Sequence, residues 1–283
     1  MLALVLAETA IGGLALAWFA PTWGNVRHGY EVLLSSTLAL MAWGAWAALQ
    51  TPLATLTGLA SSARPATVSA AVDAAEWASR GLAATAVLAG LAAIALLVVK
   101  LPPVAGRILG IGATVTGLAA LVQLAQIRGV RGGPGGLTQG ILELVLGAFL
   151  LGAIWDGMVL GHWYLVERRL INRYMVWIAW ANVAAVVGGV GAVALSARNP
   201  RPCVGLTGAE LDTCAFAFSP LLSVGSMTLM IGFGTLALLA VIAYFNVRLA
   251  KEGGRSIQAS TGMFYLAVIL APAAEFATKI RFF

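Results

Sequence analysis

Long apolar runs alternate with short polar segments along the whole chain. Each run is about 20 residues or slightly longer, the length of α-helix that crosses a hydrocarbon layer roughly 30 Å thick. The runs lie near 2–20, 31–50, 81–99, 104–127, 138–164, 173–196, 220–246 and 262–280. In lipid, a helix satisfies its backbone polar groups within one segment. The pattern therefore predicts an all-α fold, a polytopic membrane helix bundle of about eight transmembrane helices in a single domain over residues 1–283.

Two longer polar segments separate some of these runs. The first, 51–80, joins a Ser/Thr/Pro-containing loop to TVSAAVDAAEWASR, in which Val68, Val72 and Trp77 form an apolar stripe. We expect an extramembrane loop followed by an interfacial helix there. The second, 197–219, is expected to be another extramembrane loop. No basic segment precedes the first apolar run, so it is expected to be a retained helix and not a signal peptide.

Composition supports the membrane interpretation. Hydrophobic residues make up 60% of the chain and charged residues only 10%, whereas soluble domains carry about a quarter charged residues. The formal net charge is +6, but the basic residues stand in short clusters beside the apolar runs. In that position they set orientation and contact anionic lipid. The expected partner is therefore the lipid bilayer and not nucleic acid.

The two cysteines bear on orientation, because basic residues are divided almost equally between the two sets of loops. Cys203 and Cys214 stand in one polar segment, RNPRPCVGLTGAELDTC, at a spacing that a disulfide closes easily. Disulfides persist outside the cytosol, so we expect this loop and both termini on the extracytoplasmic side of a prokaryotic-type cytoplasmic membrane. Two unrelated thiols remain the alternative. Two thiols without a nearby histidine do not indicate a metal site.

Glycine indicates close helix packing. Gly106 with Gly110, Gly157 with Gly161, and the cluster at 188–191 place small residues on helix faces, where backbones can approach closely in lipid. The glycine-rich stretch 128–137 lacks the lysine and Ser/Thr of a phosphate-binding loop, so it is interpreted as a linker. The chain shows no convincing internal repeat.

Ionisable residues inside apolar runs are the main functional candidates, because a charge at mid-membrane costs at least a few kcal/mol. The candidates are Glu8, Glu143, Asp156, His162 and Glu275. In the expected orientation the three glutamates form an outer layer, and the others, together with the loop residue His28, form an inner layer. We expect Glu143 and Asp156 to face other helices and not lipid.

Each candidate also has a simpler interpretation. Glu8 and Glu275 could be interfacial, or paired with Lys279 or Arg80. Asp156 and His162 are six residues apart and point about 120° away from each other on an ideal helix, so they need not share a ligand.

The stretch GMVLGHWYLVERR closes the fifth apolar run. His162 could donate or accept a hydrogen bond to a quinone, and a haem b ligated by His28 and His162 is an alternative. Trp163 and Tyr164 could line the same quinone site. Together with the charges that follow, these residues are also typical of an aromatic belt at a membrane surface, and this interpretation is favoured.

Signatures of independent catalysis are absent from the sequence. It contains no HExxH, no carboxylate–histidine metal cluster and no nucleophile set with Ser or Cys. No catalytic residue and no metal site are therefore predicted. An accessory role in a larger assembly is favoured over an independent enzyme.

The two ends of the chain carry a resemblance. The stretch AETAIGG near the start and the last helix ending AEFATKIRFF resemble the membrane-anchor subunits of polysulfide reductase and dimethyl sulfoxide reductase type complexes. In that family the last helix tends to carry a glutamate followed by arginine; here Glu275 fits, Lys279 takes the basic position and Arg281 follows. The resemblance implies exchange of electrons or protons with quinone for a catalytic partner.

These observations lead to one expected function and two alternatives. The expected function is an integral membrane subunit of a respiratory or electron-transfer complex, which anchors other subunits and contributes a quinone site or a proton path. The quinone or proton-path candidates are Glu8, Glu143, Asp156, His162, Trp163, Tyr164 and Glu275. A secondary transporter would instead require broken helices and an inverted repeat. A haem-handling membrane protein would use His28, which lies in WGNVRH.

Overall fold

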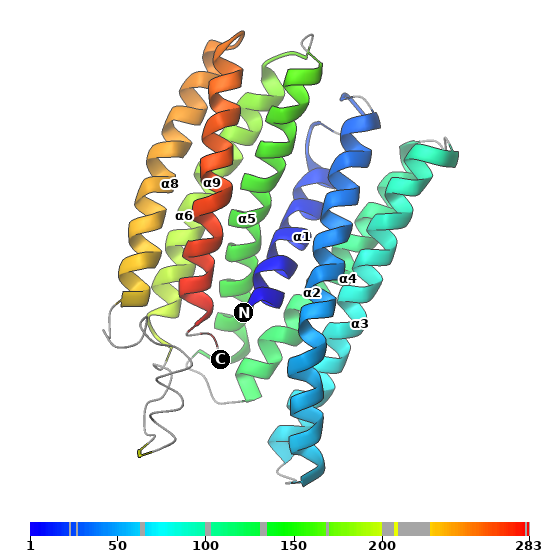
Figure 1. Cartoon of the computed structure of the whole chain (residues 1–283), viewed down its shortest axis with the longest axis vertical. Helices are drawn as coiled ribbons and strands as arrows, with labels where there is room; N and C mark the ends of the chain where they lie inside the picture. Colours follow the sequence, from blue (N-terminus) through cyan, green and yellow to red (C-terminus); the bar gives the residue numbers. More distant parts are fainter. Residues whose placement is uncertain are drawn as a thin grey trace.

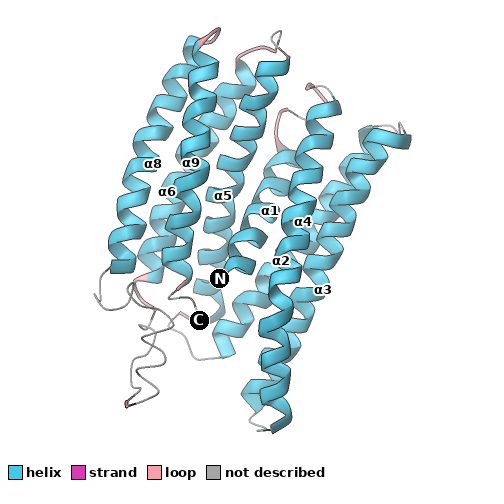
Figure 2. Cartoon of the chain, viewed as in Figure 1, coloured by secondary structure: helices cyan, strands magenta, loops and turns pink. Residues whose placement is uncertain are grey.

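The computed structural model describes residues 1–22, 24–26, 28–62, 66–99, 103–130, 135–167, 170–199, 207–208, 227–280 and 282. Over these residues the fold is all-α, and no strand is found among them (Figure 2). The helices are α1 (Leu2–Phe19), α2 (His28–Ser62), α3 (Ala66–Ile94), α4 (Pro103–Val130), α5 (Gly136–Val166), α6 (Arg173–Ser196), α8 (Met227–Glu252) and α9 (Ser256–Lys279). A short π-helix, Ala95–Val99, follows α3.

Eight of these helices are long and apolar enough to cross a membrane, which confirms the predicted fold class. Figure 1 shows them as a bundle of roughly antiparallel neighbours. The two termini lie toward the lower end of the bundle in Figure 1, and α2 begins and α5 ends at the upper end. Pro272 lies inside α9, and the helix continues past it to Lys279.

The segment 51–80 differs from its expectation. Residues 51–62, expected to be a loop, continue α2, and the predicted interfacial helix is the first part of α3. Helix α2 continues past Pro52. Around it, Thr55 Oγ1 donates to the carbonyl of Thr51, and Gln50 Nε2 donates to Ser79 Oγ of α3 at 3.1 Å. Both helices extend beyond the others at the lower end (Figure 1).

The helices form two halves with the same pattern of neighbours. In the first half α1 packs against α2 and α4, α2 packs against α3, and α3 packs against α4; α5, α6, α8 and α9 repeat this pattern in the same order. The two leading helices, α1 and α5, pack against each other and join the halves. Both carry Glu-x-x-x-Gly, at Glu8–Gly12 and Glu143–Gly147, a similarity too short to stand out in the sequence.

Glycine permits the close contact between α1 and α5. A Cβ atom on Gly12 would lie 1.7 Å from the carbonyl oxygen of Ala148, and one on Gly152 would lie 2.2 Å from the carbonyl carbon of Gly12. The expected role of the other glycines is confirmed: a Cβ on Gly110 would overlap Trp18, and one on Gly157 would overlap Phe264. Hydrogen-only side chains therefore set the spacing between the helices that position the buried polar groups.

Cys203 and Cys214 lie outside the described residues, as does most of the loop 197–219. The predicted disulfide therefore stays a prediction. The same holds for the membrane orientation that depends on it.

Candidate functional site

Five charged side chains from four helices meet inside the lower half of the bundle. Glu8 comes from α1, Arg128 from α4, Glu143 from α5, and Glu275 and Lys279 from α9, and all five are buried. We call this group the ion cluster. It confirms that Glu143 faces other helices, and it unites the three glutamates predicted to form one layer.

Lys279 is the centre of one side of the ion cluster. Its ammonium nitrogen lies 2.8 Å from Glu8 Oε1 and 3.1 Å from Glu275 Oε2, and it donates a 3.2 Å hydrogen bond to the backbone carbonyl of Glu143. An ammonium group carries three donors, so three oxygen atoms match its capacity. The interpretation that Lys279 pairs with Glu8 and Glu275 is therefore confirmed, whereas Arg80 pairs with Glu76 instead.

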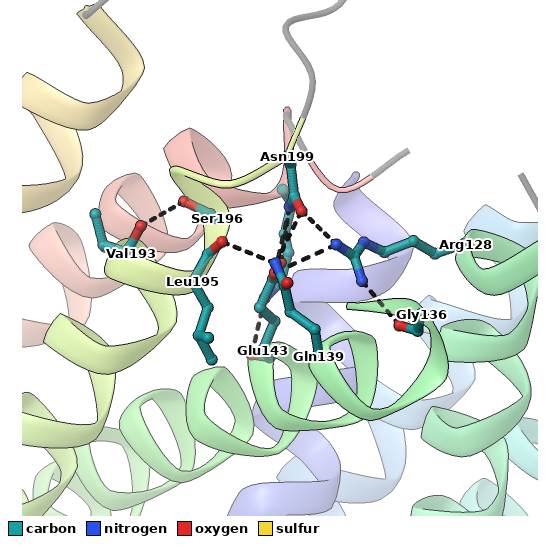
Figure 3. Close-up of polar contacts among 9 residues, drawn as sticks. Arg128, Gly136, Gln139, Glu143, Val193, Leu195, Ser196 and Asn199 are labelled. Atoms are coloured by element: carbon teal, nitrogen blue, oxygen red, sulfur yellow. Dashed lines mark hydrogen bonds and ion pairs between the residues drawn. The ribbon is translucent and has the colours of Figure 1, made fainter. Parts of the chain in front are cut away.

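Glu143 is held by amide and guanidinium groups, as Figure 3 shows. Gln139 Nε2 donates to Glu143 Oε1 at 2.7 Å, and Asn199 Nδ2 donates to Oε2 at 3.1 Å. Arg128 Nη2 lies 3.8 Å from Oε1 and also donates to the side-chain oxygen of Asn199. Arg128 Nη1 donates to the carbonyl of Gly136 at 3.1 Å. Both carboxylate oxygens of Glu143 therefore have hydrogen-bond donors.

Glu8 contrasts with Glu143. Its Oε2 atom is buried and has no hydrogen-bond partner among the described residues. A buried carboxylate oxygen without a donor is costly, and protonation of the carboxyl or a bound water removes much of that cost. Glu8 is therefore the member of the ion cluster best placed to bind and release a proton.

The numbers of acidic and basic groups in the ion cluster also indicate that it binds a proton. The ion cluster holds three carboxyl groups but two cations, so complete ionisation would leave one uncompensated negative charge in a buried site. A single proton shared among the carboxyl groups would neutralise the cluster. The arrangement can therefore store one proton while its ion pairs stay in place.

The ion pairs cross between the two halves of the chain. Glu8 of the first half pairs with Lys279 of the second, and Glu143 of the second half lies against Arg128 of the first. Each glutamate lies on the first helix of its half, α1 or α5. Each cation lies near the end of the fourth helix of its half, α4 or α9. The ion cluster thus couples the position of α9 to α1 and that of α4 to α5.

Asp156 forms a separate polar position nearer the upper end. It is buried, which confirms that it faces other helices, and its Oδ1 atom has no hydrogen-bond partner among the described residues. A Cβ on Gly13 would lie 3.0 Å from that atom, so the backbone of α1 passes close to the carboxyl. Thirteen residues of α5 separate Asp156 from Glu143, or about 20 Å at 1.5 Å per residue. The two predicted layers are therefore distinct.

The other predicted residues lie at the upper end and do not form one pocket. His162 is exposed, with Nδ1 3.1 Å from Tyr265 Oη, while Tyr164 donates to the carbonyl of Ile171. Trp163 packs against Tyr30, with ring centroids 6.3 Å apart. His162 points away from buried Asp156, as the helical spacing predicts.

His28 is the first residue of α2, so its assignment to a loop is wrong. Its Nδ1 lies 3.4 Å from Glu31 Oε2, whereas His162 lies beside Tyr265. The two imidazoles thus have different neighbours, which gives no support to a shared haem. No group of three or more metal-ligating side chains occurs among the described residues.

Several buried polar residues were missed by the sequence interpretation. Arg128 was included in the glycine-rich linker 128–137, and Gln139 and Asn199 were not singled out, although all three contact Glu143 or its partners. Asn182 and Asn246 are also buried. Neither side-chain polar atom of Asn182 has a hydrogen-bond partner among the described residues. A polar residue inside an apolar run was the available signal for Asn182 and Asn246.

Of the predicted quinone residues, Tyr164 lines a cavity of about 390 Å³, together with polar residues that include Asn172 and Arg255. Two apolar cavities, of about 380 and 190 Å³, lie between α6 and α8 and among α1, α2, α5 and α9. None of the predicted quinone residues lines either cavity. In the second cavity, Thr9 already donates its hydroxyl to the carbonyl of Val5. The buried carboxyl groups therefore do not fit a quinone site at these cavities.

Comparison with known proteins does not assign a family. No family model, no curated protein and no solved structure matches this chain.

Proposed function

We propose that this chain is an integral membrane subunit of a respiratory or electron-transfer complex, and that the ion cluster forms part of its proton path. The observation that carries the proposal is the burial of three carboxyl groups with two cations inside a bundle of apolar helices. Ionisable groups that remain within a membrane bundle commonly mark ion or proton pathways. Asp156 provides a further buried carboxyl group, about 20 Å from Glu143 along α5.

The proposal assigns distinct roles within the ion cluster. Glu8 carries the exchangeable proton, because no described residue donates a hydrogen bond to its Oε2 atom. Lys279 and Arg128 hold the remaining negative charge in place through their contacts with the glutamates. The quinone site suggested by the resemblance is not assigned to these residues, because they do not line the apolar cavities.

A secondary transporter receives less support. The two halves repeat the same neighbour pattern, and repeated halves occur in transporters. However, Gly12 and Gly152 bring α1 and α5 into backbone contact where a substrate cavity between the halves would lie. The contact favours a fixed junction over two halves that rock about a central substrate.

We expect Glu8→Gln to lower proton-coupled turnover strongly while leaving the protein assembled. The variant has two carboxyl groups and two cations in the ion cluster, so it removes the exchangeable proton and balances the charge. Loss of a positioned proton donor costs on the order of 10²-fold in rate. Proton uptake and turnover would be measured on the native assembly reconstituted in liposomes, with thermal unfolding as the test of stability. The matched control is Glu76→Gln, because Glu76 lies in an exposed ion pair with Arg80.

Native mass spectrometry of the assembly, purified in mild detergent, tests whether this chain is a subunit of a redox complex. Copurifying redox subunits are the expected result. A chain isolated alone that carries a solute with protons would replace the proposal with the transporter alternative. Normal proton-coupled turnover in Glu8→Gln would remove Glu8 from the path even if redox subunits copurify.

A further inference from the structure

The outer surface between α6 and α8 contains an apolar groove that ends at two cations. The groove has a volume of about 380 Å³ and is lined on α6 by Trp180 and Val187 and on α8 by Ala240, Tyr244, Arg248 and Lys251, among others. Trp180 and Tyr244 are about half exposed, so the groove opens onto the surface that faces lipid. Figure 1 shows α8 at the margin of the bundle, beside α6 and α9.

The groove has the length of one membrane leaflet. From Ala240 to Lys251, eleven residues of α8 rise about 16 Å at 1.5 Å per residue. Half of a hydrocarbon core roughly 30 Å thick is nearly the same length. A lipid acyl chain could therefore lie along the groove from the membrane surface to the middle of the bilayer.

The charged end of the groove selects an anion. No carboxylate among the described residues pairs with Arg248 or Lys251, and no carboxylate lines the groove. Lys251 Nζ lies 5.3 Å from the ring centroid of Trp180, which holds the ammonium over the mouth of the groove. Two unneutralised cations beside an apolar channel match a phosphate headgroup attached to an acyl chain.

We infer that the α6–α8 groove binds one anionic phospholipid, with its phosphate at Arg248 and Lys251 and an acyl chain along the groove. The inference is independent of the proton path, because the ion cluster lies inside the bundle and shares no residue with this surface.

Native mass spectrometry of the full chain in a mixture of phosphatidylglycerol and phosphatidylcholine tests the site. The wild-type protein is expected to retain phosphatidylglycerol in preference to phosphatidylcholine. Arg248→Gln with Lys251→Gln is expected to lower that preference on the order of tenfold. Arg107→Gln is the matched control, because Arg107 is an exposed cation near the upper end of α4 and does not line the groove.

A second variant separates the groove from its charges. Ala240→Phe fills the deep end of the groove and keeps both cations, so it is expected to lower retention of phosphatidylglycerol as well. Free inorganic phosphate is expected not to stabilise the wild-type protein as the phospholipid does. An unchanged lipid preference in the double variant would overturn the site. An unchanged preference in Ala240→Phe, or equal stabilisation by free phosphate, would overturn the assignment of a phospholipid to the groove.

Discussion

Lys279→Met is expected to destabilise the protein by about 3–5 kcal/mol, because it leaves buried carboxyl groups without their counter-charge. Lys279 is fully buried and lies within 3.2 Å of oxygen atoms from Glu8, Glu143 and Glu275. Methionine has a similar length and is apolar, so the change removes the charge with little loss of volume. Thermal unfolding of the purified protein in detergent measures the effect.

The control for Lys279→Met is Arg80→Met, which breaks the exposed ion pair with Glu76. Exposed pairs contribute about 0–1 kcal/mol, so this variant is expected to unfold close to the wild-type temperature. Adding Glu8→Gln to Lys279→Met removes one uncompensated carboxyl group and is expected to restore part of the lost stability. Equal losses for Lys279→Met and Arg80→Met would show that the ion cluster does not stabilise the fold.

The helices could be predicted from the sequence because each apolar run has the length that a bilayer requires. The run that became α5 was expected over 138–164, and the helix is Gly136–Val166. Burial of Glu143 and Asp156 was also predictable, since a carboxyl group in such a run avoids lipid. The cost of exposing a carboxyl group to hydrocarbon depends on its own position within an apolar run. Its burial can therefore be predicted from the sequence alone.

The partners of those carboxyl groups were less predictable because they depend on how distant helices pack. Glu275 and Lys279 are four residues apart, so their pairing was accessible from helical geometry. The contact of Lys279 with Glu8 joins opposite ends of the chain, and Arg128 reaches Glu143 from a helix end that was interpreted as part of a linker. The extension of α2 was missed for a different reason: Pro52 and the threonines near it were interpreted as a loop, whereas Thr55 and Thr57 hydroxyls bond to carbonyls within the helix.

The ion cluster also depends on how closely α1 and α5 approach. A Cβ on Gly147 would lie 2.7 Å from both Glu8 Oε1 and Glu275 Oε2, so the carboxyl groups pack directly over the backbone of α5. Any change that separates α1 from α5 therefore moves Glu8 away from its partners on α9. The ion pairs of Glu8 therefore depend on the close packing of α1 against α5 that the glycines permit.

Gly12→Ala is therefore expected to destabilise the bundle by about 1–3 kcal/mol, and to reduce proton-coupled turnover with it. The added Cβ would lie 1.7 Å from the carbonyl oxygen of Ala148, a backbone atom that cannot rotate away, so α1 must move. Gly90→Ala in α3 is the matched control, because no heavy atom lies within 4 Å of its Cβ position. Alanine favours helix over glycine by about 1 kcal/mol, so Gly90→Ala is expected to be neutral or slightly stabilising. Thermal unfolding of both variants in detergent decides the question, and a Gly12→Ala protein as stable as Gly90→Ala would show that α1 and α5 do not meet at this glycine.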